Sequence, residues 1–541
     1  MTTTHYDTPV LIAGGGPVGM SLALDLNHMG TACLVAEQDA GTALVLLAKA
    51  GTLNERTMEY CRRWGLVDKV AEVFPPDLAR DTVYCTALDG HVLGRSVIPS
   101  ANNRGTPMVG PEMLRRCPQH LFDPILANAA IASEHATVRY GLRFDSFTQD
   151  ADGVTSLLTD TVTGEQVTVR SQYLVGCDGA GSQVRKTLGV EFELITQMDF
   201  SLSAMIKFDD AELYKYIPEC ERMMFIGAEG TWANMTAVDG HGLWRFTVVG
   251  NEEALDPATF DINPIVRRAL GDTGIQYEVM RLVPWRRAQM LAKSYALGRV
   301  VLAGDTVHTT SPTGGHGVNT GIGDATDASW MLSALVAGWG GQGLLNAYTA
   351  ERRQVGWRNF GNSTQNYKVW VGAGMTNVLA HGPKGDAART NIGNMLTVGL
   401  HQEWFSQGIG MGYRYEGSPI IVPDGTPEPA DEPSNYQPTA RPGHRAPHAW
   451  LADGRSMLDL FGKGFVLLDF GAAAADVQAL TAAAAAAGVP LTVEVIDQPE
   501  IAGQYGQVLV LVRPDGQVAW RAATAPADAK HLFDVVRGAA A

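Results

Sequence analysis

Cysteine is scarce in this sequence and stops well before its end. Six cysteines are scattered over the first half of the chain, with no CxxC pair and no metal-like spacing: Cys33, Cys61, Cys85, Cys117, Cys177 and Cys220. This pattern argues against a disulfide framework and a structural zinc, and it predicts free thiols that are mostly buried. We expect no metal ion in the functional site.

Positive charge is also in short supply. The 41 lysines and arginines are outnumbered by 57 aspartates and glutamates, which leaves a net charge of −16 and a pI near 5.3. Such a chain lacks the basic surface that binds phosphate backbones, so we expect no nucleic-acid partner.

Long apolar stretches are absent as well. No uninterrupted apolar run reaches the ~18 residues of a membrane-spanning helix, so no membrane span is expected. The polar segment 1–7 lacks the charged-then-apolar plan of a signal peptide. These features predict a cytoplasmic protein.

Glycine, by contrast, is abundant. The 60 glycines among 541 residues gather in motifs rather than in a repeat. A chain of this length exceeds one ordinary core, so two or three domains are expected.

The first glycine motif, GGGPVG, lies directly after an apolar strand and before a segment with helical periodicity. Gly14 permits a tight turn, Gly16 lets a pyrophosphate approach the backbone, and Gly19 lets helix and strand pack closely. Glu37 ends the next predicted strand, where a carboxylate can bind the hydroxyls of a ribose. The motif predicts dinucleotide binding and does not separate FAD from NAD.

Two further segments follow predicted buried strands. CDGAGS (177–182) is consistent either with a strand-ending Asx turn or with a loop that touches phosphate or nicotinamide. In the third segment, Asp305 follows a strand and can face a ribityl hydroxyl. Glycines at 314, 315 and 317 then bring bare backbone close to a flat ligand. The helix predicted over 319–336 would aim its positive N-terminus at that ligand.

The remaining chain divides by composition. A helix is predicted over 54–64, with Asn54 as its N-cap. Segments 80–100 and 198–285 alternate like antiparallel strands. Residues 422–448 are dense in proline and acidic residues and form a linker or a surface crossing. Strands and helices alternate from 465 to 536, which predicts a small α/β domain.

Together these segments resemble one family. GGGPVG with Glu37, then CDGAGSQVRKTLG (177–189), then GRVVLAGDTVHTTSPTGGHGVNTGIGDATDASWML (298–332) resemble the group A flavoprotein aromatic hydroxylases, which include para-hydroxybenzoate and phenol hydroxylases. The resemblance continues through RPGHRAPHAWLADGRSMLDLFGKGFVLL (441–468) into the C-terminal domain of the phenol-hydroxylase branch.

The resemblance implies an α/β fold of three parts. A Rossmann-like FAD-binding domain of the glutathione-reductase type would be interleaved with an α+β substrate-binding domain and followed by a thioredoxin-like α/β domain. The implied ranges are 1–75, 101–185 and 286–400 for the FAD-binding domain, 76–100 and 186–285 for the substrate-binding domain, 401–448 for the linker, and 449–541 for the thioredoxin-like domain. Because the last cysteine is Cys220, that domain cannot do dithiol chemistry, and we expect it to be structural or to support a homodimer.

The resemblance also implies which residues bind FAD. Carried over position by position, they are Gly14, Gly16, Pro17, Gly19, Glu37, Gln38, Lys49, Gln119, Asp178, Gly179, Asp305, Pro312, Gly315, Gly317, Val318 and Asn319. Lys49 stands where many members have an arginine, so it keeps the charge and loses the bidentate fork. The acidic residue that phenol hydroxylases tend to carry before the position of Thr52 is missing, which leaves the general base unassigned.

The implied activity is an NAD(P)H-dependent FAD monooxygenase that uses O₂ to hydroxylate a small phenolic or other aromatic substrate through a flavin C4a-hydroperoxide. Alternatives are an oxygenase of the same fold acting on a polycyclic natural product by epoxidation or Baeyer–Villiger insertion, a non-catalytic flavin-binding redox module, and an NAD-dependent dehydrogenase. A histidine at 316 could act as base or simply be satisfied within its loop. The residues proposed to contact substrate are Met223, Phe225, Trp232, Asn234, Pro312 and Thr313, of which the first four equally suit ordinary sheet positions.

Overall fold

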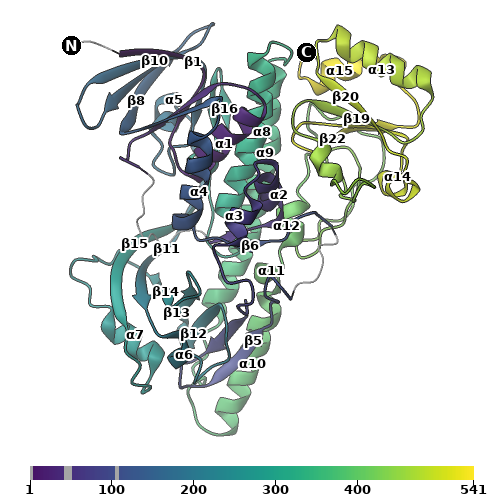
Figure 1. Cartoon of the computed structure of the whole chain (residues 1–541). Helices are drawn as coiled ribbons and strands as arrows, with labels where there is room; N and C mark the ends of the chain where they lie inside the picture. The colour runs from purple at the N-terminus through teal and green to yellow at the C-terminus, as the bar shows by residue number, and fades with distance from the viewer. Residues whose placement is uncertain (1–3, 42–50, 104–108, 541) are drawn as a thin grey trace.

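The computed structural model describes residues 4–41, 51–103 and 109–540. A first sheet lies at one end of the molecule, a second sheet at the other, and a separate C-terminal unit packs beside the first (Figure 1). Helix α8 (His316–Val336) and the long helix α9 (Gly343–Gly372) run through the middle, and α9 contacts strands of both sheets.

The first sheet has the order β16-β17-β10-β1-β2-β7, with β9 added on β10 and β8 on β9. Its strands are β1 (Thr4–Ala13), β2 (Cys33–Glu37), β7 (Ala136–Tyr140), β8 (Leu142–Gln149), β9 (Val154–Asp160), β10 (Gln166–Gly176), β16 (Ala296–Leu297) and β17 (Val300–Leu302). Strands β17, β10, β1, β2 and β7 run parallel. Helices α1 (Pro17–His28) and α8 pack together over it, and α4 (Gln119–Ile131) packs on α1. This confirms the predicted βαβ start and α/β class.

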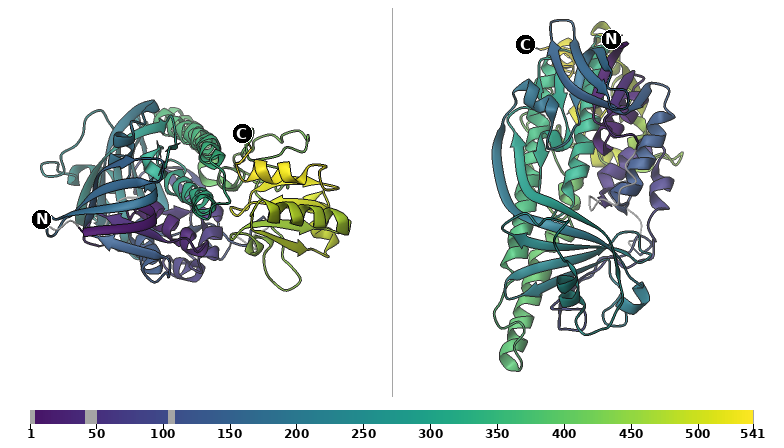
Figure 2. Two further views of the ribbon diagram at one scale, coloured as in Figure 1. Left: turned by 90° about the horizontal axis from the view of Figure 1, so that it is seen from above. Right: turned by 90° about the vertical axis from the view of Figure 1, so that its left-hand side faces the viewer.

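The second sheet is largely antiparallel, with the order β18-β15-β11-β14-β13-β12-β4-β5. Its strands are β4 (Thr82–Cys85), β5 (Val92–Ser96), β11 (Phe192–Lys207), β12 (Arg222–Gly227), β13 (Gly230–Ala237), β14 (Leu243–Asn251), β15 (Glu278–Ala292) and β18 (His308–Thr309). The pairing of β4 with β12 is parallel and joins two distant parts of the chain, as the predicted interleaving requires. Strands β11 and β15 are long and paired along their length (Figure 2, right), so the expected domain limit at 285/286 falls inside a continuous strand.

Each face of the second sheet has its own cover. Helices α6 (Asp210–Leu213) and α7 (Asn263–Leu270) contribute to one hydrophobic core with the sheet. The end of α9 and helix α10 (Pro383–Gly399) form a separate core on the other face. Because side chains alternate along a strand, neighbouring residues of β12 and β13 belong to different cores.

Short elements join the two sheets. They are β3 (Thr52–Leu53) paired with β6 (Arg115–Arg116), α2 (Glu55–Arg63), α3 (Val67–Ala71), α5 (Gln183–Leu188), α11 (His401–Trp404), α12 (Gln407–Met411) and the 3₁₀ turn η1 (Gly304–Thr306). Asn54 caps α2 as predicted, because its side chain accepts the N–H of Thr57. Among the described helices, none combines the length and the apolar character needed to cross a bilayer.

The C-terminal unit is a sheet of order β20-β19-β21-β22 with helices around it (Figure 2, left). Its elements are η2 (Met457–Leu460), β19 (Phe465–Asp469), α13 (Ala474–Ala486), β20 (Leu491–Val495), α14 (Pro499–Tyr505), β21 (Leu509–Val512), β22 (Val518–Ala522) and α15 (Ala529–Val536). These confirm the predicted alternation of strands and helices from 465 to 536. Between α12 and η2 the chain is irregular apart from two isolated bridges, one joining Arg445 to Gln517.

Candidate active site

The carboxyl ends of three parallel strands meet at one edge of the first sheet. Ala13 lies opposite both Ala36 and Gly176, and Gly176 lies opposite Leu302. The segments that follow β1, β10 and β17 are the three motifs singled out in the sequence. Parallel α/β sheets bind nucleotides at this edge, beyond the carboxyl ends of the strands.

The first motif requires glycine for two different reasons. A Cβ on Gly14, whose φ is +106°, would lie 2.4 Å from the carbonyl oxygen of Cys177, and a Cβ on Gly19 would lie 2.0 Å from the carbonyl oxygen of Gly14. At Gly16, by contrast, no heavy atom of the described chain other than Gly16 and its two chain neighbours lies within 4 Å of the Cβ position. This opening faces the first turn of α1, where Pro17 is the first residue. A pyrophosphate can therefore approach the helix N-terminus.

The carboxylate of Glu37 is held by backbone amides. Its Oε2 accepts the N–H of Gly15 (2.6 Å) and its Oε1 accepts the N–H of Asp39 (2.9 Å). Gln38 beside it is exposed. Lys49, the remaining charged residue predicted for this side of the cofactor, lies outside the described residues.

The second motif forms a helix cap. The Asp178 carboxylate accepts the backbone N–H of Gln183 (2.7 Å) and Val184 (3.0 Å) and the hydroxyl of Ser182 (2.5 Å). The Asx-type geometry is therefore present. The same carboxylate also accepts the Thr306 hydroxyl at 3.4 Å, which brings it to the third motif. Gly179, at φ +78°, has open space around its Cβ position.

Asp305 is exposed on η1 at the end of β17, which is where a ribityl chain would need an acceptor. Helix α8 packs closely behind it, since a Cβ on Gly321 would lie 3.0 Å from the Cα of Gly304. Gln119 begins α4, is half-buried, and donates to Asp123 Oδ2 (3.0 Å).

The loop from Ser311 to Gly317, here called the glycine loop, is anchored on one side. The Thr313 hydroxyl donates to the carbonyl of Ser363 on α9 (2.8 Å), and Arg287 of β15 donates to the Ser311 hydroxyl (3.0 Å). Around Gly315 and Gly317 the nearest atoms to a Cβ are 3.7 and 3.8 Å away. Bare backbone is thus presented at Gly315 and Gly317, close in the chain to exposed Pro312 and half-buried Val318.

Asn319 fixes the start of α8. Its Nδ2 donates to the carbonyls of Thr52 (2.9 Å) and Gly315 (2.8 Å). Its Oδ1 accepts the N–H of Asn54 (2.9 Å) and the hydroxyl of Thr57 (2.7 Å). This side chain therefore joins the glycine loop to β3 and α2.

His316 is placed differently from the expected base. Its ring is buried and its Nε2 contacts Asn362 Oδ1 on α9 (2.8 Å), so Nε2 is the donor. Burial lowers the pKa of His316 to about 4. A neutral, hydrogen-bonded imidazole holds the loop against α9, and the structure favours the loop-histidine alternative over a base at neutral pH.

The substrate-contacting set is split by the sheet. Met223, Phe225 and Trp232 pack in the core shared with α7, where the Arg268 guanidinium stacks 4.0 Å from the Trp232 ring. Asn234 pairs with Met224 and Thr247 and lies on the other face. Period-two alternation separates these residues, so Met223, Phe225 and Trp232 do not line a common pocket with Asn234. Thr313, within the glycine loop, is buried.

The face of the second sheet that carries Asn234 holds polar residues that we did not predict. Arg222, Thr236 and Arg245 are cross-strand neighbours on β12, β13 and β14. Thr236 Oγ1 and Arg222 Nε are buried and have no hydrogen-bond partner among the described residues. The alternation within TWANMTA would have identified this row as one face.

Arg116 connects this row to the glycine loop. It pairs with Glu221 (3.1 Å), donates to the carbonyl of Ala237 (3.1 Å), and donates to the Thr52 hydroxyl (3.1 Å), whose Cβ is the neighbour of Gly315. Burial raises the pKa of Glu221, but the guanidiniums of Arg116 and Arg80 outweigh burial and hold the pKa at about 2. Glu221 is therefore ionised.

Glu403 on α11 is a second buried carboxylate beside the loop. Its Oε2 accepts the indole N–H of Trp370 (2.6 Å), and its Oε1 lies 3.6 Å from Arg222 Nη1. Burial raises the pKa of Glu403 to about 7, although Arg222, Trp370 and the backbone N–H of Gly314 oppose the shift. No local sequence pattern marks this residue, because α11 has only four residues.

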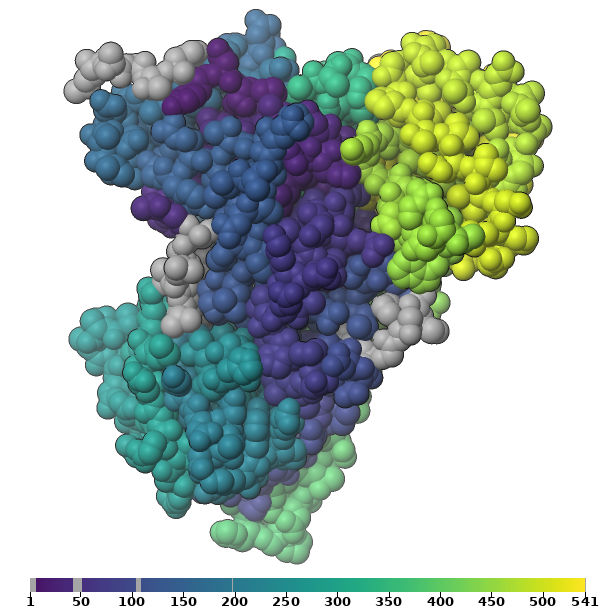
Figure 3. Space-filling view, in the orientation of Figure 1, coloured from purple at the N-terminus to yellow at the C-terminus, as the bar shows by residue number. Residues whose placement is uncertain are grey.

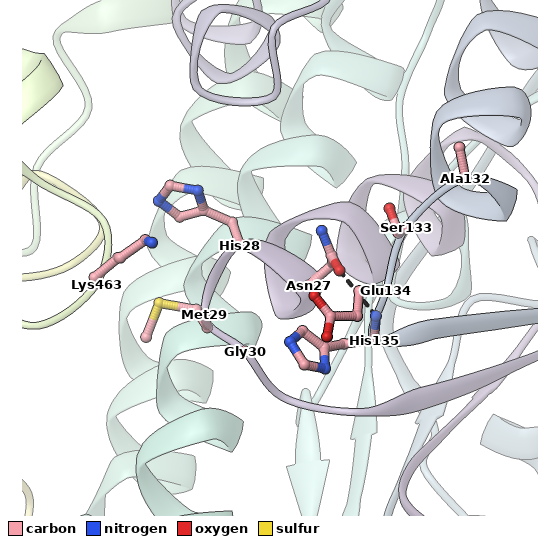
Figure 4. A pocket seen from close by; sticks show the side chains of 9 residues that line it. All are labelled: Asn27, His28, Met29, Gly30, Ala132, Ser133, Glu134, His135 and Lys463. Carbon is pink, nitrogen blue, oxygen red and sulfur yellow. Dashed lines mark hydrogen bonds between the residues drawn. The ribbon is translucent and has the colours of Figure 1, made fainter.

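A pocket elsewhere on the surface is separate from this site (Figure 4). It is lined by Asn27, His28, Met29, Gly30, residues 132–135 and Lys463. It lies at the C-terminal end of α1, whereas the GGGPVG motif lies at the N-terminal end.

The glycines, the open backbone at Gly16 and Gly315, and the exposed Asp305 fit a flavin dinucleotide laid along the sheet edge. Comparison with known proteins agrees. Residues 7–363 match the FAD binding domain family, and residues 439–540 match the aromatic-ring hydroxylase C-terminal family. The chain belongs to the group A flavoprotein aromatic hydroxylases.

Relatives of this hydroxylase align over nearly its whole length. The chain is 31% identical to tetracenomycin B2 monooxygenase-dioxygenase of Streptomyces olivaceus, covering 98% of both proteins. It is 31% identical to 2,4-dichlorophenol 6-monooxygenase of Delftia acidovorans, covering 96% of the chain and 95% of the relative. Among solved structures, the rebeccamycin biosynthetic enzyme RebC with reduced flavin superposes with a TM-score of 0.90 at 38% identity, covering 99% of this chain and 100% of that one. The chain is thus an FAD-dependent monooxygenase of the aromatic-hydroxylase type, and NAD(P)H is the co-substrate typical of its family.

Proposed function

We propose that this hydroxylase inserts one oxygen atom from O₂ into an aromatic ring that carries an ionisable hydroxyl group, with NAD(P)H as the transient reductant. The observation that carries the proposal is the meeting of three motifs at one sheet edge, with the bare side of the glycine loop close to Arg116 and the polar row of the second sheet. FAD, when bound, supplies the redox and oxygen-transfer chemistry, while the chain supplies position, charge and exclusion of water.

The cofactor would be held by the residues named for it in the sequence. Gly14, Gly16 and Gly19 would admit the pyrophosphate, Glu37 would lie beside the adenosine ribose, and Asp305 would accept from the ribityl chain. Pro312 through Asn319 would lie along the ring. The packing of Asn319, Thr313 and Ser311 supports this assignment, because it fixes the loop before any ligand arrives.

Substrate would lie between the glycine loop and the polar face of the second sheet. Asn234, Arg222 and Thr236 are our candidates for its polar contacts, in place of the three residues packed against α7. The surface is indented between the part bearing the first sheet and the part bearing the second (Figure 3). Residues 76–100 and 186–285 would then supply most of the substrate-binding part.

A second candidate is a polycyclic natural product as the substrate. Whole-length similarity to enzymes named for tetracenomycin and for rebeccamycin biosynthesis supports it, and similarity to the dichlorophenol enzyme supports a single ring. Baeyer–Villiger insertion or epoxidation would be the variant reactions. A non-catalytic redox module or a dehydrogenase is less well supported, since the tetracenomycin and dichlorophenol relatives are named monooxygenases.

The test is to purify the protein, record its visible spectrum, and measure NADH and NADPH oxidation with two substrate panels, hydroxylated single rings and hydroxylated polycyclic quinones. We expect bound FAD, faster NAD(P)H oxidation with one panel, and oxygenated product rather than peroxide. Retained flavin with peroxide as the sole product from both panels would overturn the proposal.

We further propose a cytoplasmic location, where NAD(P)H is supplied, and a homodimer, which sedimentation would test.

A further inference from the structure

The general base of this hydroxylase has no local sequence signature, because the acidic residue expected before Thr52 is missing. A carboxylate from a distant part of the chain occupies the same neighbourhood. Glu403 lies on α11, at mid-height in the molecule (Figure 1), with a side chain that is 1% exposed. The backbone N–H of Gly314, in the glycine loop, lowers the pKa of Glu403, so the carboxylate lies beside this loop.

The two oxygens of Glu403 have different surroundings. Oε2 is engaged by the indole of Trp370, which comes from α9. Oε1 is buried and accepts no hydrogen bond within the described chain. Buried carboxylate oxygens are almost always hydrogen-bonded. An acceptor left open beside the glycine loop therefore indicates a donor supplied by a ligand.

Charged and titratable groups face Glu403 from several elements. Arg222 of β12 lies 3.6 Å from Oε1 and stacks over the Trp404 ring at 4.7 Å. Arg287 of β15 lowers the pKa of Glu403 from farther away. Tyr84 of β4 is close enough to interact, and burial raises its pKa to about 12, so it stays neutral. The two guanidiniums thus favour the ionised form of Glu403 and partly offset the rise in pKa that burial causes.

The other acidic groups near the cofactor edge are engaged or exposed. The Glu37 carboxylate accepts two backbone N–H groups, and the Asp178 carboxylate caps α5. Asp305 is exposed at the end of β17. His316 is tied to Asn362 and titrates near 4, far below neutral pH. Glu403 combines burial, an open oxygen and a pKa of about 7, the combination that general bases show.

We propose that Glu403 is the base that deprotonates the ring hydroxyl of the substrate, with Arg222 as its positioning residue. The inference rests on the proposed function. The substrate O–H bond breaks, its proton passes to Glu403 Oε1, and the electron pair stays on the substrate oxygen. The resulting phenolate has an electron-rich ring, which attacks the transferred oxygen. NAD(P)H is the reductant and O₂ the oxidant, as in the reaction established for the family. Glu403, now a neutral acid, returns the proton to solvent when product leaves.

The test compares E403Q with E416Q in the FAD-loaded enzyme. Glu416 is exposed, so the second variant makes the same chemical change away from the site. With the phenol or quinone that the wild type hydroxylates, kcat should rise with pH through a midpoint near 7. E403Q should lose roughly 100-fold in kcat or more and lose that rise, while E416Q keeps both. FAD content and the flavin spectrum should not change in either variant.

Two further measurements separate a base from a structural residue. R222M removes a charge that lowers the pKa of Glu403, so the kcat rise should move to higher pH. Difference infrared spectra should show a protonated carboxyl band that titrates near 7, is present without substrate, and is absent from E403Q. Wild-type turnover with an unchanged pH profile in E403Q, or a carboxyl that titrates in its ordinary range, would overturn the assignment of Glu403. If the wild type hydroxylated none of the substrates, the proposed function would be contradicted. The infrared titration would still test whether Glu403 has a raised pKa.

Discussion

A substitution at Gly16 should change FAD binding without changing the stability of the fold. Gly16 has open space at its Cβ position, so G16A should fold like the wild type. Its FAD affinity should fall by about tenfold or more, equivalent to ~1.4 kcal/mol, because the new methyl would meet the pyrophosphate. Titration with FAD and thermal unfolding of the apoprotein measure the two effects. G361A, on exposed α9 backbone with open space, is the control and should bind FAD normally. Equal FAD affinity in G16A and wild type would contradict the cofactor placement.

A substitution at His316 tests the conclusion that this histidine is not the general base. Because its Nε2 donates to Asn362 and burial holds its pKa near 4, it is neutral across the working pH range. H316Q keeps a donor near the same position, so we expect kcat within about threefold of wild type and an unmoved pH profile. A pH profile that loses its rise near 7 in H316Q would return the role of base to the histidine.

Glu403 also links stability to pH. Its pKa is about 7 in the folded protein and near 4.5 in the unfolded chain, so the native state keeps a proton that the unfolded state loses between these values. Unfolding free energy therefore falls as pH rises through this window, by about 3 kcal/mol from this group. E403Q lacks the effect, and its melting temperature should exceed that of wild type by a margin that grows from pH 5 to 8. A constant margin would show that Glu403 titrates normally.

At the scale of elements, the local patterns were sufficient for most strands and helices. The GGGPVG turn between β1 and α1, the Asn54 cap and the C-terminal α/β alternation were all predicted from spacing, because each depends on near neighbours in the chain. For Met223, Phe225 and Trp232, the sequence did not show that these side chains pack against α7 rather than on the polar face of the second sheet. Their alternation identifies one face of β12 and β13, but which face α7 covers depends on tertiary packing.

A buried arginine in the turn between β21 and β22 holds the C-terminal unit against helix α9. Arg513 pairs with Glu351 of α9 at 2.6 Å and with Asp515, and all three side chains are fully buried. R513M would leave two carboxylates unpaired, at a cost of about 3–5 kcal/mol. We expect a lower melting temperature and faster proteolysis between residues 422 and 448. R455M breaks the exposed pair with Asp453 and is the control, expected to melt like the wild type. Identical behaviour of both variants would contradict this role of Arg513.

For the whole molecule, the sequence was most informative about the cofactor and least about the chemistry. Three motifs separated by more than a hundred residues each were recognisable because each is a short local pattern of glycine and acidic residues after a buried strand. Glu403 and Arg222 were not, since they come from α11 and β12 and meet only when α9 and the second sheet pack together. The identity of a base therefore depends on tertiary distances that no local pattern contains.

The most direct measurement for the whole molecule is turnover under isotopically labelled dioxygen with the FAD-loaded protein, NAD(P)H and a hydroxylated aromatic substrate. Mass spectrometry should find a single labelled oxygen atom in the product, with NAD(P)H consumed in equal amount. Product without label, or label recovered only as hydrogen peroxide from every aromatic substrate tested, would contradict the assignment of this chain as an aromatic monooxygenase.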